Sequence, residues 1–386
     1  MGLYPEPAVE RAMRIQEVVL RAMSGQLSWL QAAEIIGVTP RQMRRWRARY
    51  AEHGYDGLLD RRRRRPSDKK VPGAVVAQVL QLYRERYFDF NVRHFQEVLA
   101  REHAITLSYS WVKAALQTAG LVARARKRGP HRRRHERRPL PGMLLHIDAS
   151  RHAWIPDGLQ DLVSVSDDAT NELYYARLVP EETTRTVLEA LRAVVATQGR
   201  FCALYTDRAS HFIHTPKPEQ PQRRTQVERA LEQLGIELIA AHSPQARGRK
   251  ERLYGTLQGR WPQELRVAGV TTMAAANAWL TREGIARYNR RFAVPAPHAG
   301  TAFVLAPADL DHIFSVQQTR VVSNANTVQL GRRVFQILPS RLRCHFVRCH
   351  VTVHEHLDGT YSITYGPHLI GRYAADGQPL PLPTAA

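Results

Sequence analysis

The sequence predicts a multidomain protein that combines all-α units, an α/β core and a small all-β region, and three observations lead to that prediction. Residues 1–138 hold 29 of the 56 Lys and Arg but only 13 of the 35 Asp and Glu, so they carry +16 of the net charge of +21. Apolar residues recur at helical spacing in this basic part, the middle alternates strand-like and helix-like runs, and the end contains short β-like runs. A basic region joined to a near-balanced remainder is typical of a nucleic-acid-binding part attached to another function.

Residues 1–60 predict a helix-turn-helix unit. A first short helix is expected at 29–36, Gly37 supplies the turn, and Thr39 caps a second helix that starts with Pro40. Apolar positions of the second helix face the core, which leaves its basic side chains outward, as a recognition helix in a major groove requires. The DNA-contacting residues predicted on this helix are Arg41, Gln42, Arg44 and Arg45. An ordinary helical hairpin with a solvated basic face is the alternative.

Two basic linkers flank a second helical unit. Residues 61–71 have no apolar periodicity and suit phosphate tracking or a minor groove. The DNA contacts predicted in this linker are Arg61, Arg62 and Arg63. Residues 72–122 predict a second helix-turn-helix-like domain, with Ser108 as the cap of its last helix. A DNA contact and a purely structural role are both open for this domain, because it carries fewer outward Arg. Residues 123–139 form the second linker.

Residues 140–292 predict an α/β layer. The expected order is three strands, a helix, a strand, a helix, a strand and a helix, at 143–148, 161–167, 172–179, 183–198, 201–206, 224–234, 236–241 and 247–265. Three antiparallel strands followed by alternating helices and strands give a mixed five-stranded sheet, which is the order of the ribonuclease H-like fold. Beyond this core, residues 315–373 predict a small β-barrel and residues 374–386 a disordered Pro-rich tail.

Three acidic residues lie where predicted elements meet polar loops. Asp148 and Asp207 end strand-like apolar runs, and Glu251 falls in the first turns of the last core helix. Two strand-end aspartates and a helix-borne glutamate can hold a pair of divalent ions for in-line attack on a phosphodiester. For Glu251 the alternative is a surface glutamate that the helix dipole favours. Beside it, Arg249 and Lys250 are expected to grip DNA, although solvated helix charges explain them almost as well.

Other polar residues near these positions have simpler explanations. Asp167 and Asp168 sit at a turn, where Asp commonly bonds its own backbone, so we predict a structural role for both. His152 and His211 follow the two strand-end aspartates, and we expect each to be a hydrogen-bonded surface histidine. The sequence has no Gly-rich phosphate loop of the Walker type, so we expect no nucleotide cofactor.

Six phrases carry a resemblance to a known family. They are His-Ile-Asp-Ala-Ser at 146–150, Val-Ser-Asp-Asp-Ala-Thr at 165–170, Tyr-Thr-Asp-Arg at 205–208, the run from Ser243 to Arg252, the run from Leu257 to Leu265, and Tyr-Asn-Arg-Arg-Phe at 288–292. They resemble bacterial insertion-sequence transposases with a retroviral-integrase-type DDE core, and most closely the ISNCY-type group. The resemblance implies that Asp148, Asp207 and Glu251 together hold two Mg²⁺ ions, for which Mn²⁺ can substitute. The family usually has Gly where this chain has Ala149, a difference that touches no ligand.

The acidic residues and the resemblance together predict a DNA transposase. The helix-turn-helix units would bind the terminal inverted repeats of an insertion sequence, and the core would hydrolyse and transfer strands as a Mg²⁺-dependent polynucleotidyl transferase. The expected partners are double-stranded DNA, both element ends and target, and further copies of the chain in a dimer or higher assembly. A catalytically inactive DNA-binding regulator derived from a transposase is the alternative. A plain nuclease fits the core but does not explain two helix-turn-helix units.

Cysteine usage and hydropathy limit where the protein is expected to work. The three cysteines give no disulfide framework, which indicates a reducing compartment. The first residues lack a signal-peptide pattern, and no stretch approaches the ~18 apolar residues of a membrane span. We therefore expect a soluble, cytoplasmic bacterial protein that associates with the nucleoid and has no membrane partner.

Overall fold

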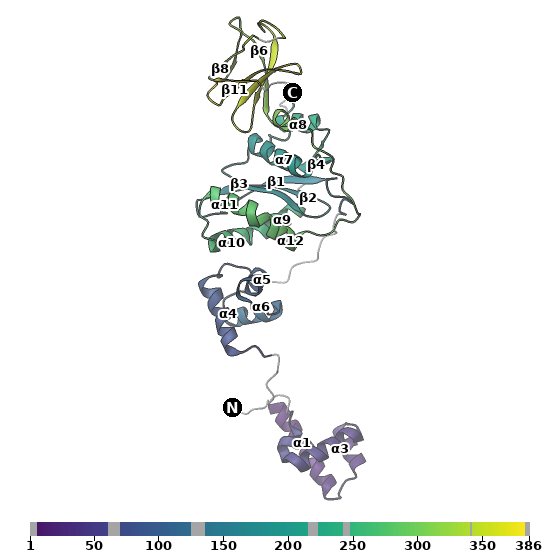
Figure 1. Ribbon diagram of the computed structural model, residues 1–386. Coiled ribbons are helices and arrows are strands. Elements are labelled where there is room, and N and C mark those ends of the chain that lie inside the picture. Colours follow the sequence, from purple (N-terminus) through teal and green to yellow (C-terminus); the bar gives the residue numbers. More distant parts are fainter. Residues whose placement is uncertain are drawn as a thin grey trace. The chain divides into compact units, whose positions relative to one another are not determined.

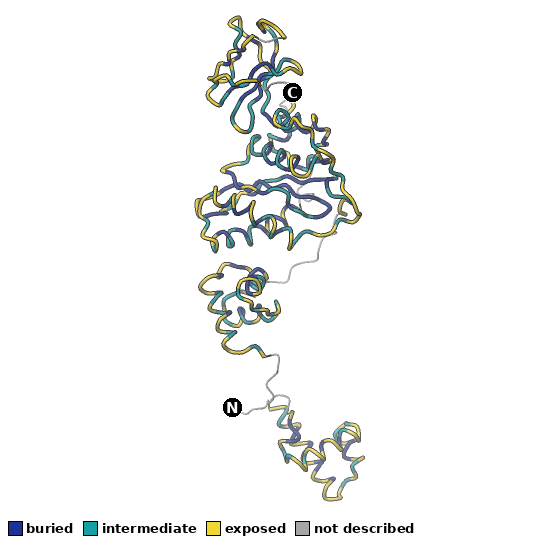
Figure 2. Tube along the Cα trace, in the orientation of Figure 1, coloured by how far each residue is buried: buried dark blue, intermediate teal, exposed yellow. Residues whose placement is uncertain are grey.

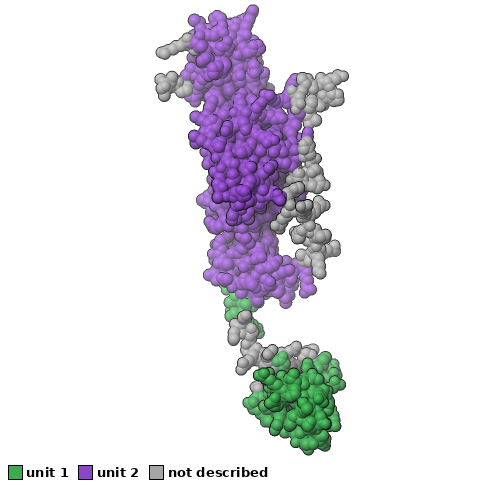
Figure 3. All heavy atoms as spheres, turned by 90° about the vertical axis from the view of Figure 1, so that its right-hand side faces the viewer, with its two compact units in different colours: residues 1–78 green, residues 79–386 purple. Residues whose placement is uncertain are grey.

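The computed structural model describes residues 6–60, 70–124, 136–214, 223–241, 248–339 and 342–382, and it leaves the side chains of residues 248 and 249 undescribed. The chain divides into two compact units, residues 1–78 and residues 79–386, which Figure 3 shows in two colours. Among the helices in the described ranges, none has the length and apolar character that a membrane crossing needs.

The first unit is a small helical domain whose elements follow the sequence prediction. Its helices are α1 (Glu6–Met23), α2 (Trp29–Ile36), α3 (Pro40–His53) and the short η1 (Gly54–Leu58). Gly37 ends α2 with a φ of 72°, a left-handed conformation that suits glycine, and the Thr39 side chain accepts from the backbone N–H of Gln42 at the start of α3. Met43 and Trp46 are buried in the apolar core between the helices. The predicted helix-turn-helix is confirmed.

The second helical unit consists of α4 (Gly73–Glu85), α5 (Val92–His103) and α6 (Tyr109–Thr118), and the division between the two compact units falls inside α4. Asn91 caps α5 and Ser108 caps α6, each through a side-chain oxygen that accepts a backbone N–H. Phe95, Val112 and Leu116 are fully buried, whereas Trp111 is half-buried. Short polar side chains therefore begin both helices, and apolar side chains hold them together.

The centre of residues 79–386 is a mixed five-stranded sheet. Its strands are β1 (Leu145–His152), β2 (Gln160–Asp167), β3 (Leu173–Val179), β4 (Ala203–Thr206) and β5 (Glu237–Ala240). Their order is β3-β2-β1-β4-β5, in which β1, β2 and β3 run antiparallel while β4 lies parallel to β1 and to β5. This arrangement confirms the predicted ribonuclease H-like core.

Helices cover both faces of this sheet (Figure 1). On one face lie α7 (Thr184–Gln198) and α8 (Gln226–Gln233), which share one apolar cluster with the strands. On the other lie α9 (Gly248–Gln258), α10 (Trp261–Val267), α11 (Met273–Trp279) and α12 (Ile285–Phe292), around a second cluster rich in tryptophan. Figure 2 shows the buried residues concentrated along the strands between these layers.

The last core helix differs from its prediction, because the expected single helix at 247–265 is two helices. Helix α9 ends at Gln258 and α10 starts at Trp261, with Pro262 in its first turn. A proline ring clashes with the carbonyl four residues earlier, here Gln258, so a continuous helix is unfavourable at this point. The break turns the chain between the two helices and leaves Gly259 and Arg260 as their connection.

The C-terminal region is built from α13 (Leu310–Ile313) and antiparallel strands. The strands are β6 (Val316–Val321), β7 (Thr327–Leu330), β8 (Arg333–Gln336), β9 (His350–Glu355), β10 (Tyr361–Tyr365), β11 (His368–Tyr373) and β12 (Pro379–Leu380). Five of them form a sheet in the order β12-β11-β10-β9-β6, and β7 pairs with β8. The predicted closed barrel is not confirmed, since the β7–β8 ribbon joins the sheet through apolar side chains such as Val328 and Phe335. Strand β12 lies inside the segment that we expected to be a disordered tail.

Candidate active site

Asp148 lies inside β1 rather than at the end of a strand. The sequence predicted that the strand stops at this residue, but the antiparallel pairing with β2 continues to His152, which is opposite Gln160. Asp148 is half-buried, and its Oδ1 accepts the backbone N–H of Ala149 at 3.1 Å. The apolar run ends at Asp148 because one side of the strand becomes accessible there, while the backbone pairing continues.

The parallel register of β1 and β4 aligns the strand segments that lead to the two aspartates. Leu145 pairs with Leu204 and His146 with Tyr205 in parallel register. Asp148 and Asp207 each come two residues after the second of these pairs, and Asp207 lies just beyond the end of β4. An ideal continuation of this register would set the two residues on the same face of the sheet, on strands about 4.8 Å apart. Asp207 is also half-buried, and its Oδ1 accepts the backbone N–H of Ala209 at 2.9 Å.

Helix α9, which carries Glu251 in its first turn, packs against β1 beside Asp148. The Tyr254 hydroxyl donates to the backbone carbonyl of Asp148, and Gln258 Nε2 donates to Ser150 Oγ at 2.9 Å. Residues 251, 254 and 258 are spaced i, i+3 and i+7, so they follow one flank of the helix. Glu251 therefore begins the stripe whose next two members contact β1, although its own side chain is exposed.

Lys250 occupies the side of α9 that faces the sheet. Its side chain is only 5% exposed, and Nζ donates at 3.2 Å to both the carbonyl oxygen and the hydroxyl of Ser164 on β2. Ser164 is the register partner of Asp148 and also contacts the hydroxyl of Tyr254 at 2.9 Å. We expected Lys250 to reach outward to DNA, and instead it lies in a polar network beneath Asp148. A lysine in a helix with basic neighbours gives no sign of this in the sequence.

The turn after β2 has the structural role predicted for its two aspartates. Asp167 accepts the backbone N–H groups of Gly142 and Thr170 at 2.8 and 2.9 Å. Asp168 accepts from the backbone N–H of Arg138 at 2.8 Å and contacts His146 Nε2 at 2.9 Å. Both carboxylates are buried and bind chain segments before and after β1. They hold the start of β1 in place and are not exposed to a substrate.

The predicted DNA-contacting residues differ in how they are placed. On α3 the side chains of Arg41, Arg44 and Arg45 are exposed and Gln42 is half-buried, opposite the buried face of the helix. The predicted contacts Arg61, Arg62 and Arg63, and the side chain of Arg249, lie outside the described residues. The exposed face of α3 therefore has the basic character that the sequence predicted.

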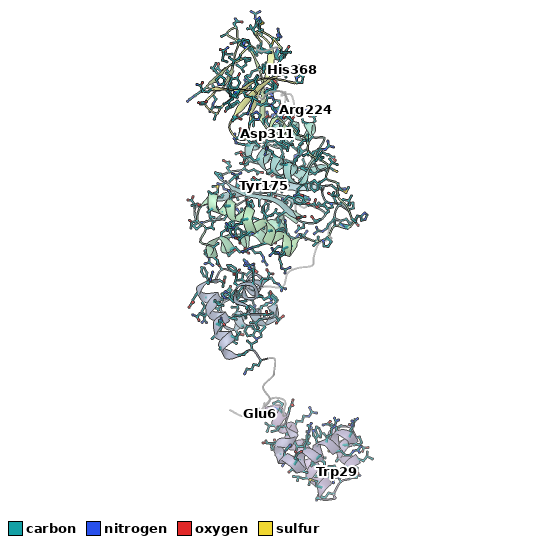
Figure 4. All side chains as sticks on the ribbon, viewed as in Figure 1. Glu6, Trp29, Tyr175, Arg224, Asp311 and His368 are labelled. Carbon is teal, nitrogen blue, oxygen red and sulfur yellow. The ribbon has the colours of Figure 1, made fainter. Side chains whose placement is uncertain are left out.

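No group of three or more His, Cys, Asp or Glu side chains that could hold a metal ion occurs in the described parts of the chain. The structure thus aligns β1, which carries Asp148, with β4, which Asp207 follows, and among the described residues it groups neither of them with Glu251 as metal ligands. The segment immediately before α9, residues 242–247, lies outside the description. A cavity of about 750 Å³ is elsewhere, between α7 and the C-terminal sheet, with Tyr175 and Asp311 in its lining (Figure 4). None of the three acidic residues lines that cavity.

The chain is similar to known protein families and to curated proteins. A helix-turn-helix domain family matches residues 16–67, and a homeodomain-like domain family matches residues 42–116. The putative transposase y4bF of Sinorhizobium fredii is 31% identical over 365 residues, which cover 93% of this chain and 80% of that protein. The chain belongs to the bacterial insertion-sequence transposases. The transposase for insertion sequence IS1202 of Streptococcus pneumoniae is 25% identical over 369 residues, or 86% of this transposase and 79% of that one.

Solved integrase structures match this transposase more weakly. The catalytic core domain of HTLV-2 integrase in complex with magnesium is 14% identical, with a TM-score of 0.29, and the match covers 37% of this chain and 88% of that chain. The simian T-cell lymphotropic virus intasome in complex with the PP2A regulatory subunit B56 gamma is 15% identical, with a TM-score of 0.32 and coverage of 66% and 84%. TM-scores this low do not establish a shared fold. The strand order and register described above identify the fold of the core.

Proposed function

We propose that this transposase binds the terminal inverted repeats of an insertion sequence and there catalyses phosphodiester hydrolysis and strand transfer with two divalent metal ions. Asp148, Asp207 and Glu251 would be the ligands. The observation that supports this proposal is the parallel register of β1 and β4, which would set Asp148 beside Asp207 if continued by two residues, while α9 packs on β1. A protein that only binds DNA has no need for carboxylates in this arrangement.

The residues present fit a hard divalent ion such as Mg²⁺, with Mn²⁺ as a substitute. Such ions prefer carboxylate oxygens, and both Asp148 and Asp207 are half-buried. Glu251 lies in the first turn of α9, which packs on β1, and would complete the set. When bound, the ions supply charge neutralisation at the scissile phosphate and an activated water or 3′-hydroxyl.

A hydrogen-bonded network of side chains lies next to Asp148. The network of Lys250, Ser164 and Tyr254 joins α9 to β1 and β2 beneath Asp148. Its buried polar atoms are hydrogen-bonded, so the network resists displacement of α9 when a charged substrate arrives. In this proposal the protein orients the phosphate and the attacking hydroxyl, and forms no covalent intermediate with DNA.

DNA binding is assigned to the basic helical parts. The exposed arginines of α3 would read the major groove of the repeat, and the basic linker at 61–71 would contact phosphates. Two element ends must be joined to one target, so the active form would be a dimer or a higher assembly on DNA. The purpose of the C-terminal sheet would be further DNA or subunit contacts.

Strand joining from a precut element end tests this proposal. The substrate is a duplex that ends at the terminal repeat of the transposase's own element with a free 3′-hydroxyl, and the target is a supercoiled plasmid. We expect joining in Mg²⁺ or Mn²⁺, none after chelation, and a loss of at least about 1,000-fold in Asp148→Asn, because the two-metal chemistry supplies most of the acceleration.

Asp157→Asn is the matched control, since Asp157 is an exposed aspartate in the loop after β1. It should join ends at the native rate. Binding of the end by the native protein without joining in either metal would contradict the proposal and favour the non-catalytic regulator.

A further inference from the structure

The second helical unit makes a set of polar contacts with the core that the proposed function does not use. The contacts join residues at and before α5 to the connection between α9 and α10, to α10 itself and to α12. We refer to them as the α5 clamp. Its members are Asp89, Asn91, His94 and Glu97 on the helical side, and Gly259, Arg260, Glu264, Arg266 and Arg291 on the core side.

Glu97 is the centre of the clamp. Its Oε2 accepts from Arg260 Nη1 at 2.7 Å, and its Oε1 accepts from Arg291 Nε at 2.9 Å. Burial opposes the charge on this carboxyl, but the two arginine hydrogen bonds outweigh burial and hold the pKa of Glu97 below its ordinary value. The Arg260 side chain is 12% exposed, so this pair is far better shielded from water than a surface ion pair.

A second, more deeply buried pair lies beside it. His94 Nε2 donates to Glu264 Oε1 at 2.8 Å, and the two side chains are only 1% and 9% exposed. Burial lowers the pKa of His94, and its Nδ1 has no hydrogen-bond partner among the described residues, which favours the neutral ring. Burial opposes the charge on Glu264, but the hydrogen bond from His94 and the charge of Arg287 are among the effects that hold its pKa below its ordinary value.

The edges of the clamp are equally specific. Asn91 caps α5 through its Oδ1 and donates from its Nδ2 to the carbonyl of Gly259 at 3.0 Å. Asp89 binds Arg266 through both oxygens, at 2.6 and 2.9 Å. Such a two-pronged pair fixes orientation as well as distance. The helical unit is therefore held at several points, in one orientation.

The clamp lies at the C-terminal end of α9. Gly259 and Arg260 directly follow α9, and α9 is the helix that carries Glu251 in its first turn and contacts Asp148 through Tyr254. One rigid helix thus connects the acidic centre at its start with the helical unit at its end. A displacement of the clamp would be transmitted to the acidic centre along α9.

We propose that the α5 clamp is a positioning device, which fixes the second helical unit to the core so that DNA bound by the helical units reaches the acidic centre in one orientation. This inference rests on the proposed function. It adds that Glu97 and Arg260 act in cleavage without touching DNA or metal. The DNA-binding step would not need the clamp, whereas the rate and the position of the cut would.

Charge reversal at Glu97 tests the clamp. Glu97→Lys places a cation between Arg260 and Arg291, and the double variant Glu97→Lys/Arg260→Glu restores an opposite-charge pair. The matched control is Glu85→Lys, the same charge change at an exposed position of α4. Each full-length variant is compared on a labelled duplex that carries the element end, by affinity, by nicking rate at saturation and by the position of the nick.

The expected result is a split between binding and cleavage. Glu97→Lys should bind the end as tightly as Glu85→Lys does, but nick it about 100-fold more slowly and at scattered positions, since small misplacements of reacting groups have effects of this size. The double variant should recover most of the rate and the single position. Native nicking by Glu97→Lys, or a loss of affinity equal to the loss of nicking, would overturn the proposal.

Hydrogen exchange separates a failure of the clamp from a failure of the proposed function. In the native protein without DNA, the backbone amides of α5 and α10 should be better protected than in Glu97→Lys, and the double variant should restore the protection. Unchanged protection in Glu97→Lys would show that the clamp does not hold the unit. A native protein that nicks no end would overturn the proposed function, and with it the positioning role, even if exchange shows that the contacts form.

Discussion

The two helical units of this transposase end in similar helix-turn-helix elements but use them differently. Thr39 caps α3 and Ser108 caps α6, in each case by accepting the backbone N–H three residues later. Helix α3 carries five arginines, and the three that we predicted to contact DNA, Arg41, Arg44 and Arg45, are exposed. Helix α6 carries a single cation, Lys113, which is half-buried.

The difference extends to the helix that precedes each last helix. In the first unit, α2 is short and contributes apolar side chains to the core. In the second helical unit, α5 carries His94 and Glu97, whose clamp partners Glu264 and Arg260 lie 170 and 163 residues further along the chain. The same local fold therefore occurs in two settings, since one unit exposes its basic side chains and the other uses charged side chains for contacts with the core.

The largest effect expected from this comparison is on recognition of the element end. Arg44→Ala/Arg45→Ala should weaken end binding by about 100-fold, because each arginine contact to a base or phosphate contributes about 1–3 kcal/mol. Lys113→Ala in α6 should change it by less than about tenfold. The two affinities are measured by gel shift at one salt concentration.

The salt dependence of the same measurement sharpens the contrast. The slope of log affinity against log salt should fall by about 0.9 for each phosphate-contacting cation that is removed. We therefore expect a clear decrease for the arginine variant and a smaller one for the lysine variant. Equal losses for the two variants would mean that both helices contact DNA in the same way.

The two helical units should also differ in how their stability depends on pH. Burial lowers the pKa of His94. The neutral ring therefore contributes its full stabilisation above about pH 6.5, the ordinary pKa of histidine. Each pH unit below that value removes up to about 1.4 kcal/mol of this stabilisation. The pKa of Glu264 is also lowered, so its contribution is present above its ordinary value and is lost only at still lower pH. Both effects weaken the second unit as the pH falls.

Hydrogen-exchange protection of α5 and α3 measures this effect between about pH 7.5 and about pH 5.5, the range in which histidine titrates. Protection of α5 should fall with pH after correction for intrinsic exchange, and His94→Gln should remove most of that dependence. In the first unit, His53 lies at the partly exposed end of α3 and has no comparable buried partner among the described residues. If the hydrogen-exchange protection of α3 fell with pH as much as that of α5, the expected difference between the two helical units would be contradicted.

The smallest effect concerns the caps that the two units share. Thr39→Ala and Ser108→Ala should each lower the free energy of unfolding by about 1 kcal/mol, because each removes one hydrogen bond to the first turn of a helix. The costs should match, but only Thr39→Ala should also weaken end binding, since only α3 is assigned to the groove. Thermal unfolding and gel shift on the same preparations would detect a failure of either expectation.

The local chemistry of the chain was sufficient to predict most of the fold. Gly37, Thr39 and Ser108 mark helix ends by conformations and hydrogen bonds that involve only neighbouring residues, and the structure has them as predicted. The order of strands and helices in the core likewise follows from the spacing of apolar residues and from the turn residues between the elements. The single helix predicted at 247–265 did not allow for Pro262. Its position is visible in the sequence, and a proline ring clashes with the preceding turn of a helix.

Long-range features were not predictable in the same way. The continuation of β1 beyond Asp148 depends on pairing with β2, and the burial of Lys250 depends on Ser164, 86 residues away. The clamp joins residues that are more distant still. A charged residue in an exposed-looking helix gives no local sign of such a partner, because the partner is set by tertiary packing alone.

For the acidic residues, sequence and structure supply different parts of the argument. The motifs and the resemblance select Asp148, Asp207 and Glu251, and the strand register adds that the first two follow paired residues of β1 and β4 at the same distance along the chain. Their metal binding and the inclusion of Glu251 remain predictions for experiment.

The most direct test of the central claim is to measure binding and nicking of one labelled element-end duplex by the native transposase and by Asp207→Asn in Mg²⁺. We predict that both bind the end with similar affinity and that only the native protein nicks it at the element boundary. Nicking by Asp207→Asn at the native rate would contradict the assignment of the acidic centre. Binding without nicking by the native protein, in Mg²⁺ and in Mn²⁺, would contradict the claim that this transposase is an active enzyme.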